Sequence, residues 1–440
     1  MNPYVQYMYS YPHKTAYRPL DNVSLTAYIP LLAGRGHGLY FHIPFCQSKC
    51  GYCNLFSVAG QGEEEIERYL DAVERQGRQY KELLSGCGAE FSGLTVGGGT
   101  PLFLTAGQLE RMFGISERYF RFCGERTIEV ETAPNQTEKE KLRILKQAGV
   151  TRVSMGIQSF SDRELATLHR RHNAERAKEA LHLIRDFDFP CVNIDFIYGI
   201  PGQTVESLLN SLKEALRFEP DEIFLYPLYV KHGARLEHEG MVLNPSAAYT
   251  QYQEAAGFLK GEGFCQDSMR RFTRRSRARE YSDCGFGTSL ALGCGGRSYL
   301  GRLHFCSPYA ITREKCLAGL GEYERTEDFS VIKHGILLSE EEVKRRYVIR
   351  HLLIYPGLGL RQYREAFGSC AIEDFPVLCD WTDKGYVRQG EYLSLTEEGL
   401  SLSDYLGPQL ISPAIRRAMA EWEEHNGQAY GTLQGKPEKL

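Results

Sequence analysis

Six short apolar runs alternate with segments of helical periodicity between Gly38 and Leu228. This rhythm is typical of βα units, in which crossover helices cover a parallel sheet. The predicted strands are Gly38–Ile43, Gly93–Gly98, Thr127–Thr132, Arg152–Ile157, Val192–Gly199 and Glu222–Leu228. The pattern predicts an α/β fold, but it does not separate an open doubly wound sheet from a full or partial barrel. In each of these folds, functional side chains lie at the carboxyl ends of the strands.

Helix boundaries in this region are marked by capping signals. A Ser or Thr followed three residues later by Glu or Gln forms a capping box, which satisfies backbone N–H groups at a helix start. The pairs that fit are Thr105 with Gln108, Thr137 with Glu140, and Ser161 with Glu164. Gly149 stands where a C-terminal glycine ends the helix that follows Thr137.

The rhythm changes after about residue 310, where helical segments and a small hairpin replace the βα units. Ser339 with Glu342 predicts the start of a helix that runs to about Ile354. The proline within Tyr355–Gly357 ends this helix. Gly385–Leu395 predicts a hairpin, followed by a helix from about Thr396. Helices with a small hairpin resemble a winged-helix module, which commonly binds DNA. The acidic composition favours a packing or substrate-covering role here.

The overall charge limits the class of partner. Charged residues make up 25% of the chain and its formal net charge is -4, whereas a general nucleic-acid binder carries a strong basic excess. We therefore expect a small-molecule substrate and no nucleic acid. No apolar run approaches the roughly 18 residues that span a bilayer, and the polar, tyrosine-rich start lacks a signal peptide's apolar stretch. We expect a cytoplasmic protein with no membrane segment.

Three of the 13 cysteines stand close together, directly after the first predicted strand. Cys46, Cys50 and Cys53 have the spacing CxxxCxxC. A [4Fe-4S] cluster normally takes four thiolates, one per iron, so three close cysteines leave one iron open to a substrate or cofactor. The other cysteines are scattered over a long chain, and we expect them to be structural thiols rather than a disulfide framework.

Two structural alternatives also fit three cysteines at this spacing. Positions i, i+4 and i+7 form one face of a buried helix, although Pro44 and Gly51 weaken a helical interpretation. A structural zinc site prefers four closed ligands and paired CxxC motifs, and no second pair follows in the sequence. The cluster therefore remains the favoured hypothesis.

The surrounding motifs add a family resemblance. HIPFCxxxCxYC (His42–Cys53) resembles the radical S-adenosylmethionine (SAM) branch that contains oxygen-independent coproporphyrinogen III oxidase and its heme-chaperone relatives. The likeness is strong over about residues 38 to 230 and weak in the C-terminal region. Further motifs follow in the family's order: VGGGTP (Val96–Pro101), IEVE (Ile128–Glu131), SMGIQSF (Ser154–Phe160), LHRRH (Leu168–His172) and NIDFIYGIPGQT (Asn193–Thr204). A lone glycine segment is a weak signal, whereas the ordered set is highly specific.

The resemblance implies a [4Fe-4S] cluster on the three cysteines, with SAM bound at its open iron. Tyr40 would lie near the sulfonium as a catalytic and SAM-binding residue. The other implied SAM contacts are Gly98, Gly99, Thr100, Glu129, Gln158, Arg170 and Asp195. Arg170 can pair bidentately with the SAM carboxylate. Each residue also has an ordinary structural interpretation: Arg170 as a solvated arginine beside Arg171, and Glu129 and Asp195 as members of structural pairs.

The same resemblance implies a domain plan. A partial (β/α)6 radical SAM barrel would carry a smaller C-terminal α+β domain of winged-helix type. The expected divisions are an N-terminal arm (1–37), the radical SAM catalytic domain (38–310), the C-terminal helical and winged-helix domain (311–425) and a flexible tail (426–440).

The implied enzyme is a radical SAM oxidoreductase similar to coproporphyrinogen III dehydrogenase. Its cluster would be reduced by a donor such as a flavodoxin or ferredoxin, and SAM would be cleaved to a 5′-deoxyadenosyl radical. In the oxidase of porphyrin and heme biosynthesis, a propionate then loses carbon dioxide and becomes a vinyl group. Such a tetrapyrrole carries four carboxylates, which the arginine-rich segment Arg270–Arg279 would suit. A solvated basic loop is the alternative.

Several positions depart from the oxidase. It has a fourth cysteine two residues after the third, where this chain has Asn54 and Leu55. Tyr229 and Tyr299 stand where the oxidase has smaller or aliphatic residues, which counts against a second SAM site. Three functions therefore stay open: a decarboxylase of porphyrinogen propionates, a radical SAM methyltransferase or heme-modifying enzyme, and a heme-binding chaperone.

Overall fold

The computed structural model describes residues 2–8, 10–231, 233–274 and 287–426. The six predicted strands are all present, as β2 (Gly34–Ile43), β5 (Ala89–Gly98), β6 (Phe122–Thr132), β7 (Arg152–Gln158), β8 (Cys191–Tyr198) and β9 (Glu222–Pro227). Each pairs in parallel with the next, in the order β2-β5-β6-β7-β8-β9. The alternation of apolar runs and helical segments therefore predicted both the strands and their direction.

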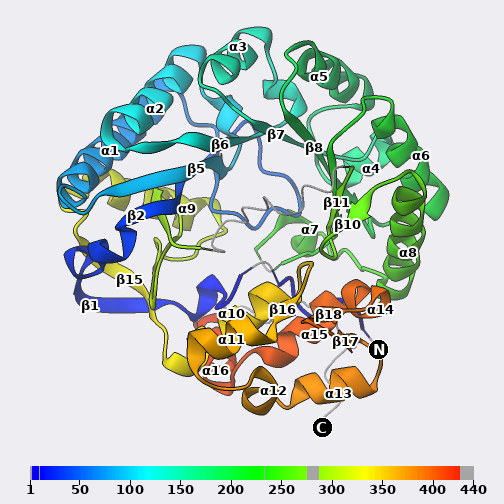
Figure 1. Ribbon diagram of the computed structural model, residues 1–440. Helices are drawn as coiled ribbons and strands as arrows, with labels where there is room; N and C mark the ends of the chain where they lie inside the picture. The colour runs from blue at the N-terminus through cyan, green and yellow to red at the C-terminus, as the bar shows by residue number, and fades with distance from the viewer. Residues whose placement is uncertain (1, 9, 232, 275–286, 427–440) are drawn as a thin grey trace.

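These strands curve into a partial barrel with helices on the outside (Figure 1). The outer helices are α1 (Glu63–Leu83), α2 (Ala106–Tyr119), α3 (Lys139–Gln147), α5 (Ala174–Asp186), α6 (Val205–Leu216) and α8 (Pro245–Gly261). Their apolar faces join the sheet in one hydrophobic core. The partial barrel of the sequence-based prediction is confirmed.

Further strands extend the sheet at both edges. On one side β12 (Ser289–Leu292) is parallel to β2, followed by antiparallel β13 (Ser298–Leu300), β14 (Leu303–Phe305), β15 (Val331–Leu337) and β1 (Arg18–Ser24). On the other side β11 (Arg271–Thr273) pairs antiparallel with β9 and with β10 (Cys265–Gln266). The shorter elements are η1 (Lys14–Ala16), η2 (Leu25–Leu32), β3 (Phe45–Cys46), β4 (Val58–Ala59), η3 (Pro101–Phe103), η4 (Pro134–Gln136), α4 (Asp162–Thr167), α7 (Arg235–His238) and α9 (Arg313–Arg325).

The capping signals predicted helix ends with mixed success. Thr105 and Gln108 form the expected box at the start of α2. The box at Thr137 is wrong, because its hydroxyl donates to the Ala133 carbonyl and α3 begins later, at Lys139. Gly149 follows α3 with a positive φ of 76°, as a helix-ending glycine should.

The box predicted at Ser161 is also wrong, although α4 does begin directly after this residue. Glu164 is 3% exposed and turns inward instead of capping the helix. Its carboxylate accepts from Ser159 Oγ at 2.6 Å and from Gln203 Nε2 at 2.9 Å. A buried carboxylate needs such donors, so the tertiary contacts outweigh the local cap.

The C-terminal module, residues 340–426, lies at the open side of the partial barrel (Figure 1). It contains α10 (Glu340–Leu352), β16 (Leu358–Gly359), α11 (Leu360–Phe367), α12 (Ala371–Asp374), α13 (Val377–Asp383), β17 (Val387–Gln389), β18 (Tyr392–Leu395), α14 (Glu397–Ser401), α15 (Ser403–Leu406), η6 (Gly407–Leu410) and α16 (Pro413–His425). The predicted hairpin is β17 and β18, which join β16 in a three-stranded sheet. Ser339 caps α10 as expected, by accepting from the Glu342 N–H.

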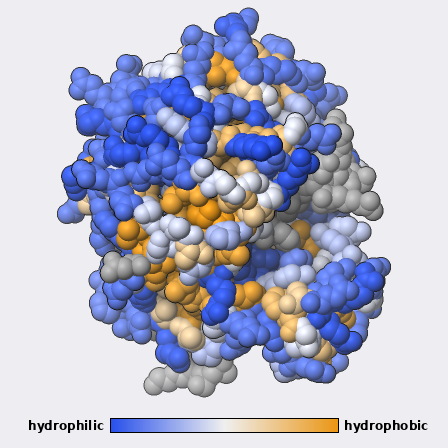
Figure 2. Space-filling model, turned by 60° about the vertical axis from the view of Figure 1, so that its left-hand side comes forward, coloured by the Kyte–Doolittle hydropathy of each residue, from blue (hydrophilic) through white to orange (hydrophobic). Residues whose placement is uncertain are grey.

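The segment before β2 ties the barrel to this module. β1 pairs with β15 at the edge of the large sheet, while Tyr11 and Ala16 enter the hydrophobic core of the module, which also contains Trp381. Figure 2 brings the β1 side of the molecule forward, where hydrophobic residues gather in the middle of a mostly hydrophilic surface. Within the described ranges, none of the helices has the length and apolar character needed to cross a membrane.

Candidate active site

A cavity of about 840 Å³ lies inside the partial barrel. Its walls include the loops after β2, β5 and β6, the segment before η1, and residues of α10 in the C-terminal module. The predicted site residues that line it are Cys46, Cys50, Cys53, Gly98, Gly99, Thr100, Glu129, Gln158, Arg170 and Asp195. Residues that lie far apart in the sequence therefore meet in one space, as the parallel-sheet topology requires.

The three cysteines stand on one irregular loop that follows β2. The backbone is not helical between Gln47 and Cys53, so the buried-helix alternative is wrong. Gly51 fixes the loop, because its N–H donates to the Leu168 carbonyl and its carbonyl accepts from the Leu236 N–H. A Cβ at Gly51 would lie 2.5 Å from the His169 ring, so this close approach requires glycine.

Each cysteine sulfur contacts one polar side chain. Arg170 Nη1 lies 3.1 Å from Cys50 Sγ, and Thr100 Oγ1 lies 3.7 Å from Cys46 Sγ. Cys53 Sγ lies 3.8 Å from Ser57 Oγ. Burial raises the pKa of the Cys46 thiol to about 12, so a metal or cluster is needed to hold it as a thiolate.

The cysteine trio consists of thiols that are free to act as ligands. A [4Fe-4S] cluster binds each thiolate to a different iron, so three cysteines on one loop suffice to hold it with one iron open. All cysteines in the described ranges are free thiols, which leaves this trio available as ligands.

The loop also carries a fixed positive charge between two of the cysteines. Lys49 Nζ donates to three backbone carbonyls, those of Ile311 at 2.6 Å, Leu55 at 3.2 Å and Ser57 at 3.4 Å. The ammonium therefore anchors the loop to the segment before α9 and supplies positive charge beside the thiols. Positive charge of this kind stabilises thiolates and an anionic cluster.

The glycine segment after β5 lies directly against the cysteine loop. The Gly99 N–H donates to the Ile43 carbonyl and the Thr100 N–H to the Phe45 carbonyl. A Cβ at Gly99 would lie 2.7 Å from the Phe45 oxygen and 2.9 Å from Cys46 Sγ. The backbone can therefore approach this closely only without a side chain.

Gly99→Ala is predicted to displace Cys46 and to lower 5′-deoxyadenosine formation about tenfold or more, because overpacking of this kind costs roughly 1–3 kcal/mol. Iron content and product formation measure the effect after anaerobic reconstitution. Gly107→Ala in α2 is the matched control, since its Cβ meets nothing within 4 Å. Unchanged iron content and activity in Gly99→Ala would contradict the predicted packing.

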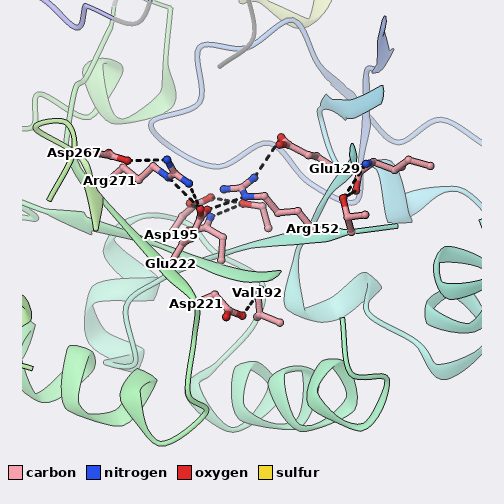
Figure 3. Close-up of polar contacts among 12 residues, drawn as sticks. Glu129, Arg152, Val192, Asp195, Asp221, Glu222, Asp267 and Arg271 are labelled. Carbon is pink, nitrogen blue, oxygen red and sulfur yellow. Dashed lines mark hydrogen bonds and ion pairs between the residues drawn. The ribbon is translucent and has the colours of Figure 1, made fainter. Parts of the chain in front are cut away.

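The acidic residues of the barrel form an alternating chain of charges. Arg152 lies between Glu129 at 3.6 Å and Glu222 at 2.8 Å, and Arg271 lies between Glu222 and Asp267 (Figure 3). Arg152 and Glu222 were not among the predicted site residues, and Arg271 was expected only as part of the arginine-rich segment. Their ion pairs could not be predicted from the sequence, because each partner comes from a different strand or from the loop before β11.

Asp195 lies beside this chain on β8. Asn193 Nδ2 donates to its carboxylate at 2.7 Å, and Ser154 Oγ does so at 3.5 Å. Burial is the largest influence and raises the pKa of Asp195 to about 6. Gln158, at the end of β7, has a positive φ of 76°. A non-glycine residue with such a backbone is uncommon, and strain of this kind concentrates at functional sites.

Glu131 is a cavity residue that was not among the predicted site residues. Its carboxylate accepts from the Gly98 N–H at 3.1 Å and faces the cavity. Desolvation raises its pKa to about 7; nearby Asp195 and Glu129 add to the rise, and Gly98 and Arg152 oppose it. The sequence does contain a signal for this residue. Side chains two residues apart in a strand point to the same face, so Glu131 was expected to share the face of β6 that carries Glu129.

The raised pKa predicts how Glu131 affects stability. The folded chain binds this proton more tightly than the unfolded chain, whose reference pKa is 4.5. The contribution of this proton to the free energy of unfolding is fully present below about pH 4.5 and is lost as the pH rises through about 7. Glu131→Gln should therefore gain stability relative to the parent chain between pH 5 and pH 8, measured by urea unfolding without SAM. Glu110→Gln on the exposed face of α2 is the control, and a pH-independent difference for Glu131→Gln would contradict the raised pKa.

Tyr40 lies on the strand that leads into the cysteine loop. It is half-buried on β2, and its hydroxyl lies 3.2 Å from His42 Nδ1. It is absent from the described residues that line the cavity. Tyr40 is nevertheless in register with Thr95 of β5, and Thr95 is in register with Glu129 of β6. Both of these residues line the cavity, so the Tyr40 side chain lies on the cavity side of the sheet.

The first two arginines of the Arg270–Arg279 segment are buried rather than solvated, and both line the cavity. Arg270 is buried and paired with Asp404 of the C-terminal module, and Arg271 is paired with Glu222 and Asp267. The solvated-loop alternative is therefore wrong at Arg270 and Arg271, and the carboxylates that both residues contact belong to the chain itself. Residues 275–279 lie outside the described residues.

Comparisons with known proteins show which family and which relatives the chain resembles. Residues 40–215 match the model of the radical SAM superfamily. Oxygen-independent coproporphyrinogen III oxidase of Escherichia coli (strain K12) is 26% identical over 88% of this chain and 89% of the relative. The heme chaperone HemW of Haemophilus influenzae is 28% identical over 60% of this chain and 70% of the relative.

A solved structure supports the fold over nearly the whole chain. Coproporphyrinogen III oxidase from Escherichia coli, described as a radical SAM enzyme, superposes with a TM-score of 0.81 at 24% identity. The match covers 92% of this chain and 96% of the solved one. The chain therefore matches the radical SAM superfamily over residues 40–215 and is similar to oxygen-independent coproporphyrinogen III oxidase and HemW over a larger part of its length.

Proposed function

We propose that the chain binds a [4Fe-4S] cluster through Cys46, Cys50 and Cys53 and uses it to cleave SAM reductively. The observation that carries this proposal is the convergence of the cysteine loop and the glycine segment on one cavity. When bound, the reduced cluster supplies one electron to SAM, which breaks the C5′–S bond and yields methionine and a 5′-deoxyadenosyl radical. A small electron-transfer protein such as a flavodoxin or ferredoxin is the proposed reductant.

We assign the SAM pocket to the residues named by the family resemblance. Gly98, Gly99 and Thr100 would hold the amino-acid end through backbone groups, and Arg170 would pair with its carboxylate. The remaining proposed contacts are Glu129, Gln158, Asp195 and Tyr40. The first three line the cavity. Tyr40 would contact SAM from its position on β2, or influence it through His42, which its hydroxyl contacts.

The proposed domain plan follows the same function. Residues 38–310 would form the catalytic domain, 1–37 an arm, 311–425 a cover and 426–440 a tail. Ile349, Arg350, Leu353 and Ser403 of the C-terminal module line the cavity, which supports a substrate-covering role rather than nucleic-acid binding. A cytoplasmic, reducing environment would suit the free thiols.

For the substrate, we propose a tetrapyrrole whose propionates are oxidatively decarboxylated. The radical would take one hydrogen atom from a propionate, and loss of carbon dioxide with transfer of one electron to an acceptor would leave a vinyl group. The near-complete coverage of the Escherichia coli oxidase supports this candidate. Heme delivery is the second candidate, because Asn54 and Leu55 follow Cys53 where the oxidase has its fourth cysteine.

Product mass after anaerobic turnover tests these candidates. With coproporphyrinogen, reductant and SAM, the proposed reaction removes carbon dioxide and two hydrogens from each converted propionate. A one-carbon gain would instead identify a radical methyltransferase, and stoichiometric heme binding without any product would identify a delivery protein. Either of these results would contradict the decarboxylase.

A further inference from the structure

An arginine of the connection between α4 and α5 contacts the cysteine loop. Arg170 Nη1 donates to Cys50 Sγ at 3.1 Å, and its Nη2 donates to the Gly156 carbonyl. Among the described residues, the buried Nε of Arg170 has no hydrogen-bond partner. Two of the three guanidinium nitrogens are therefore engaged by the chain itself, and one of them holds a proposed cluster ligand.

The backbone before Arg170 explains why its side chain is fixed in this direction. α4 ends in two hydrogen bonds, from the His169 N–H to the Ala166 carbonyl at 3.0 Å and from the Arg170 N–H to the Leu165 carbonyl at 2.9 Å. This pair of bonds is a Schellman motif, in which the residue with a left-handed backbone is usually glycine. Here that residue is His169, with a φ of 55°.

Contacts with the cysteine loop hold His169 in this uncommon conformation. Its Nε2 lies 2.8 Å from a carboxylate oxygen of Glu239, and its ring lies where a Cβ of Gly51 would be. The Gly51 N–H also donates to the Leu168 carbonyl. Backbone strain that the surroundings maintain concentrates at functional sites. The strained turn therefore packs directly on the cysteine loop, which fixes Arg170 relative to that loop.

An apolar cluster borders the contact between the arginine and the sulfur. Leu168, Ile197 and Leu236 belong to this cluster, and Tyr52 of the cysteine loop packs against it. A hydrogen bond in such surroundings is electrostatically stronger than the same bond in water. The bond from Arg170 also carries a full positive charge, which makes it stronger than a bond from a neutral donor.

The other two cysteines have weaker polar contacts. Thr100 Oγ1 lies 3.7 Å from Cys46 Sγ, and Ser57 Oγ lies 3.8 Å from Cys53 Sγ. Both hydroxyl groups are neutral, and both distances are longer than the one from Arg170. Of these three contacts, the one from Arg170 therefore has the largest electrostatic effect on a sulfur.

Hydrogen bonds to the sulfurs and the surrounding charge set the reduction potential of an iron–sulfur cluster. A cationic N–H donor stabilises the reduced cluster more than the oxidised one, because reduction adds negative charge. We propose that Arg170 is a positioning residue that fixes Cys50 and raises the reduction potential of the bound cluster. The inference rests on the proposed function. It leaves Nε of Arg170 for the SAM carboxylate, so that pairing uses one N–H rather than a bidentate fork.

Redox titration followed by electron paramagnetic resonance tests the proposal on the reconstituted full-length chain without SAM. Arg170→Met removes the donor and its charge. It should lower the equilibrium constant for one-electron reduction of the cluster about tenfold, which is a shift of about 59 mV to lower potential. Arg170→Lys keeps the charge and should recover about half of this shift.

Arg163→Met is the matched control for the titration. Arg163 is exposed on α4 and does not line the cavity, so its loss should leave the potential unchanged. Iron content shows which chains carry a full cluster. A fully loaded Arg170→Met variant with the potential of the parent chain would overturn the proposal, because a purely structural role would change stability or iron content alone.

A spectroscopic measurement on the parent chain keeps the test decisive if a variant loses its cluster. With arginine labelled by ¹⁵N in the guanidinium group, pulsed electron paramagnetic resonance of the reduced cluster should detect coupling to a labelled nitrogen. Arg170→Lys should abolish this coupling, and it should persist in the parent chain when SAM is added. A parent chain without the coupling, or one that loses it on SAM binding, would overturn the proposal.

The proposed function and this inference can fail separately. A reduced, fully loaded parent chain that cleaves no SAM would refute the proposed function, while the potential and the nitrogen coupling would still decide the role of Arg170. Normal SAM cleavage together with an unchanged potential in Arg170→Met would refute the inference alone.

Discussion

Simultaneous replacement of Cys46, Cys50 and Cys53 by alanine is expected to abolish both the four-iron cluster and the cleavage of SAM. The three sulfurs are the proposed ligands, and removal of all of them leaves no thiolate in the loop to bind iron. Iron and sulfide content, the visible absorbance of the cluster and 5′-deoxyadenosine measure the result after anaerobic reconstitution. All of these should fall to background.

Other cysteines provide a matched control for this variant. Cys265, Cys370 and Cys379 are free, exposed or half-exposed thiols, and none of them lines the cavity. Their triple replacement by alanine should leave cluster content and SAM cleavage unchanged. A full four-iron cluster in the variant that lacks Cys46, Cys50 and Cys53 would refute the ligand assignment.

Asp404→Ala is expected to cause the largest loss of stability. Asp404 is fully buried, and its carboxylate pairs with Arg270 and accepts from Tyr229 at 2.6 Å and from the Met8 N–H at 3.2 Å. Its loss would leave the Arg270 guanidinium buried without its counter-charge, which costs about 3–5 kcal/mol. Because the contacts join the barrel, the arm and the C-terminal module, the arm should also become more sensitive to proteolysis.

Tryptophan fluorescence can follow this effect in the relevant part of the chain. The two tryptophans, Trp381 and Trp422, both lie in the C-terminal module, so urea unfolding monitored by fluorescence reports on that module. The paired variant Arg270→Met with Asp404→Leu is the control, because it removes both charges and should be less destabilised than Asp404→Ala. Equal stability of Asp404→Ala and the parent chain would show that the ion pair does not hold the module in place.

The barrel could be predicted from the sequence because its strands are buried on both faces. Such strands appear as nearly continuous apolar runs, and the helices between them fix their parallel direction. The positions of the cysteine loop and the glycine segment could also be predicted from the sequence, since each directly follows a predicted strand. The structure confirms that they meet, with Gly99 directly against Cys46.

The charge pairs could not be predicted in the same way. Arg271 and Glu222 are 49 residues apart, and Arg270 and Asp404 are 134 residues apart, so no local pattern reveals either pair. The arginine-rich segment consequently resembled a ligand-binding stretch, although its first two members neutralise buried carboxylates.

Reductive cleavage of SAM tests the central claim most directly. The chain would be reconstituted anaerobically with iron and sulfide, reduced with dithionite and supplied with SAM, and 5′-deoxyadenosine would be measured by mass spectrometry with and without tetrapyrrole. The proposed function predicts 5′-deoxyadenosine together with methionine, and none when the reductant is omitted. Intact SAM in the presence of a full, reduced cluster, with and without tetrapyrrole, would contradict it.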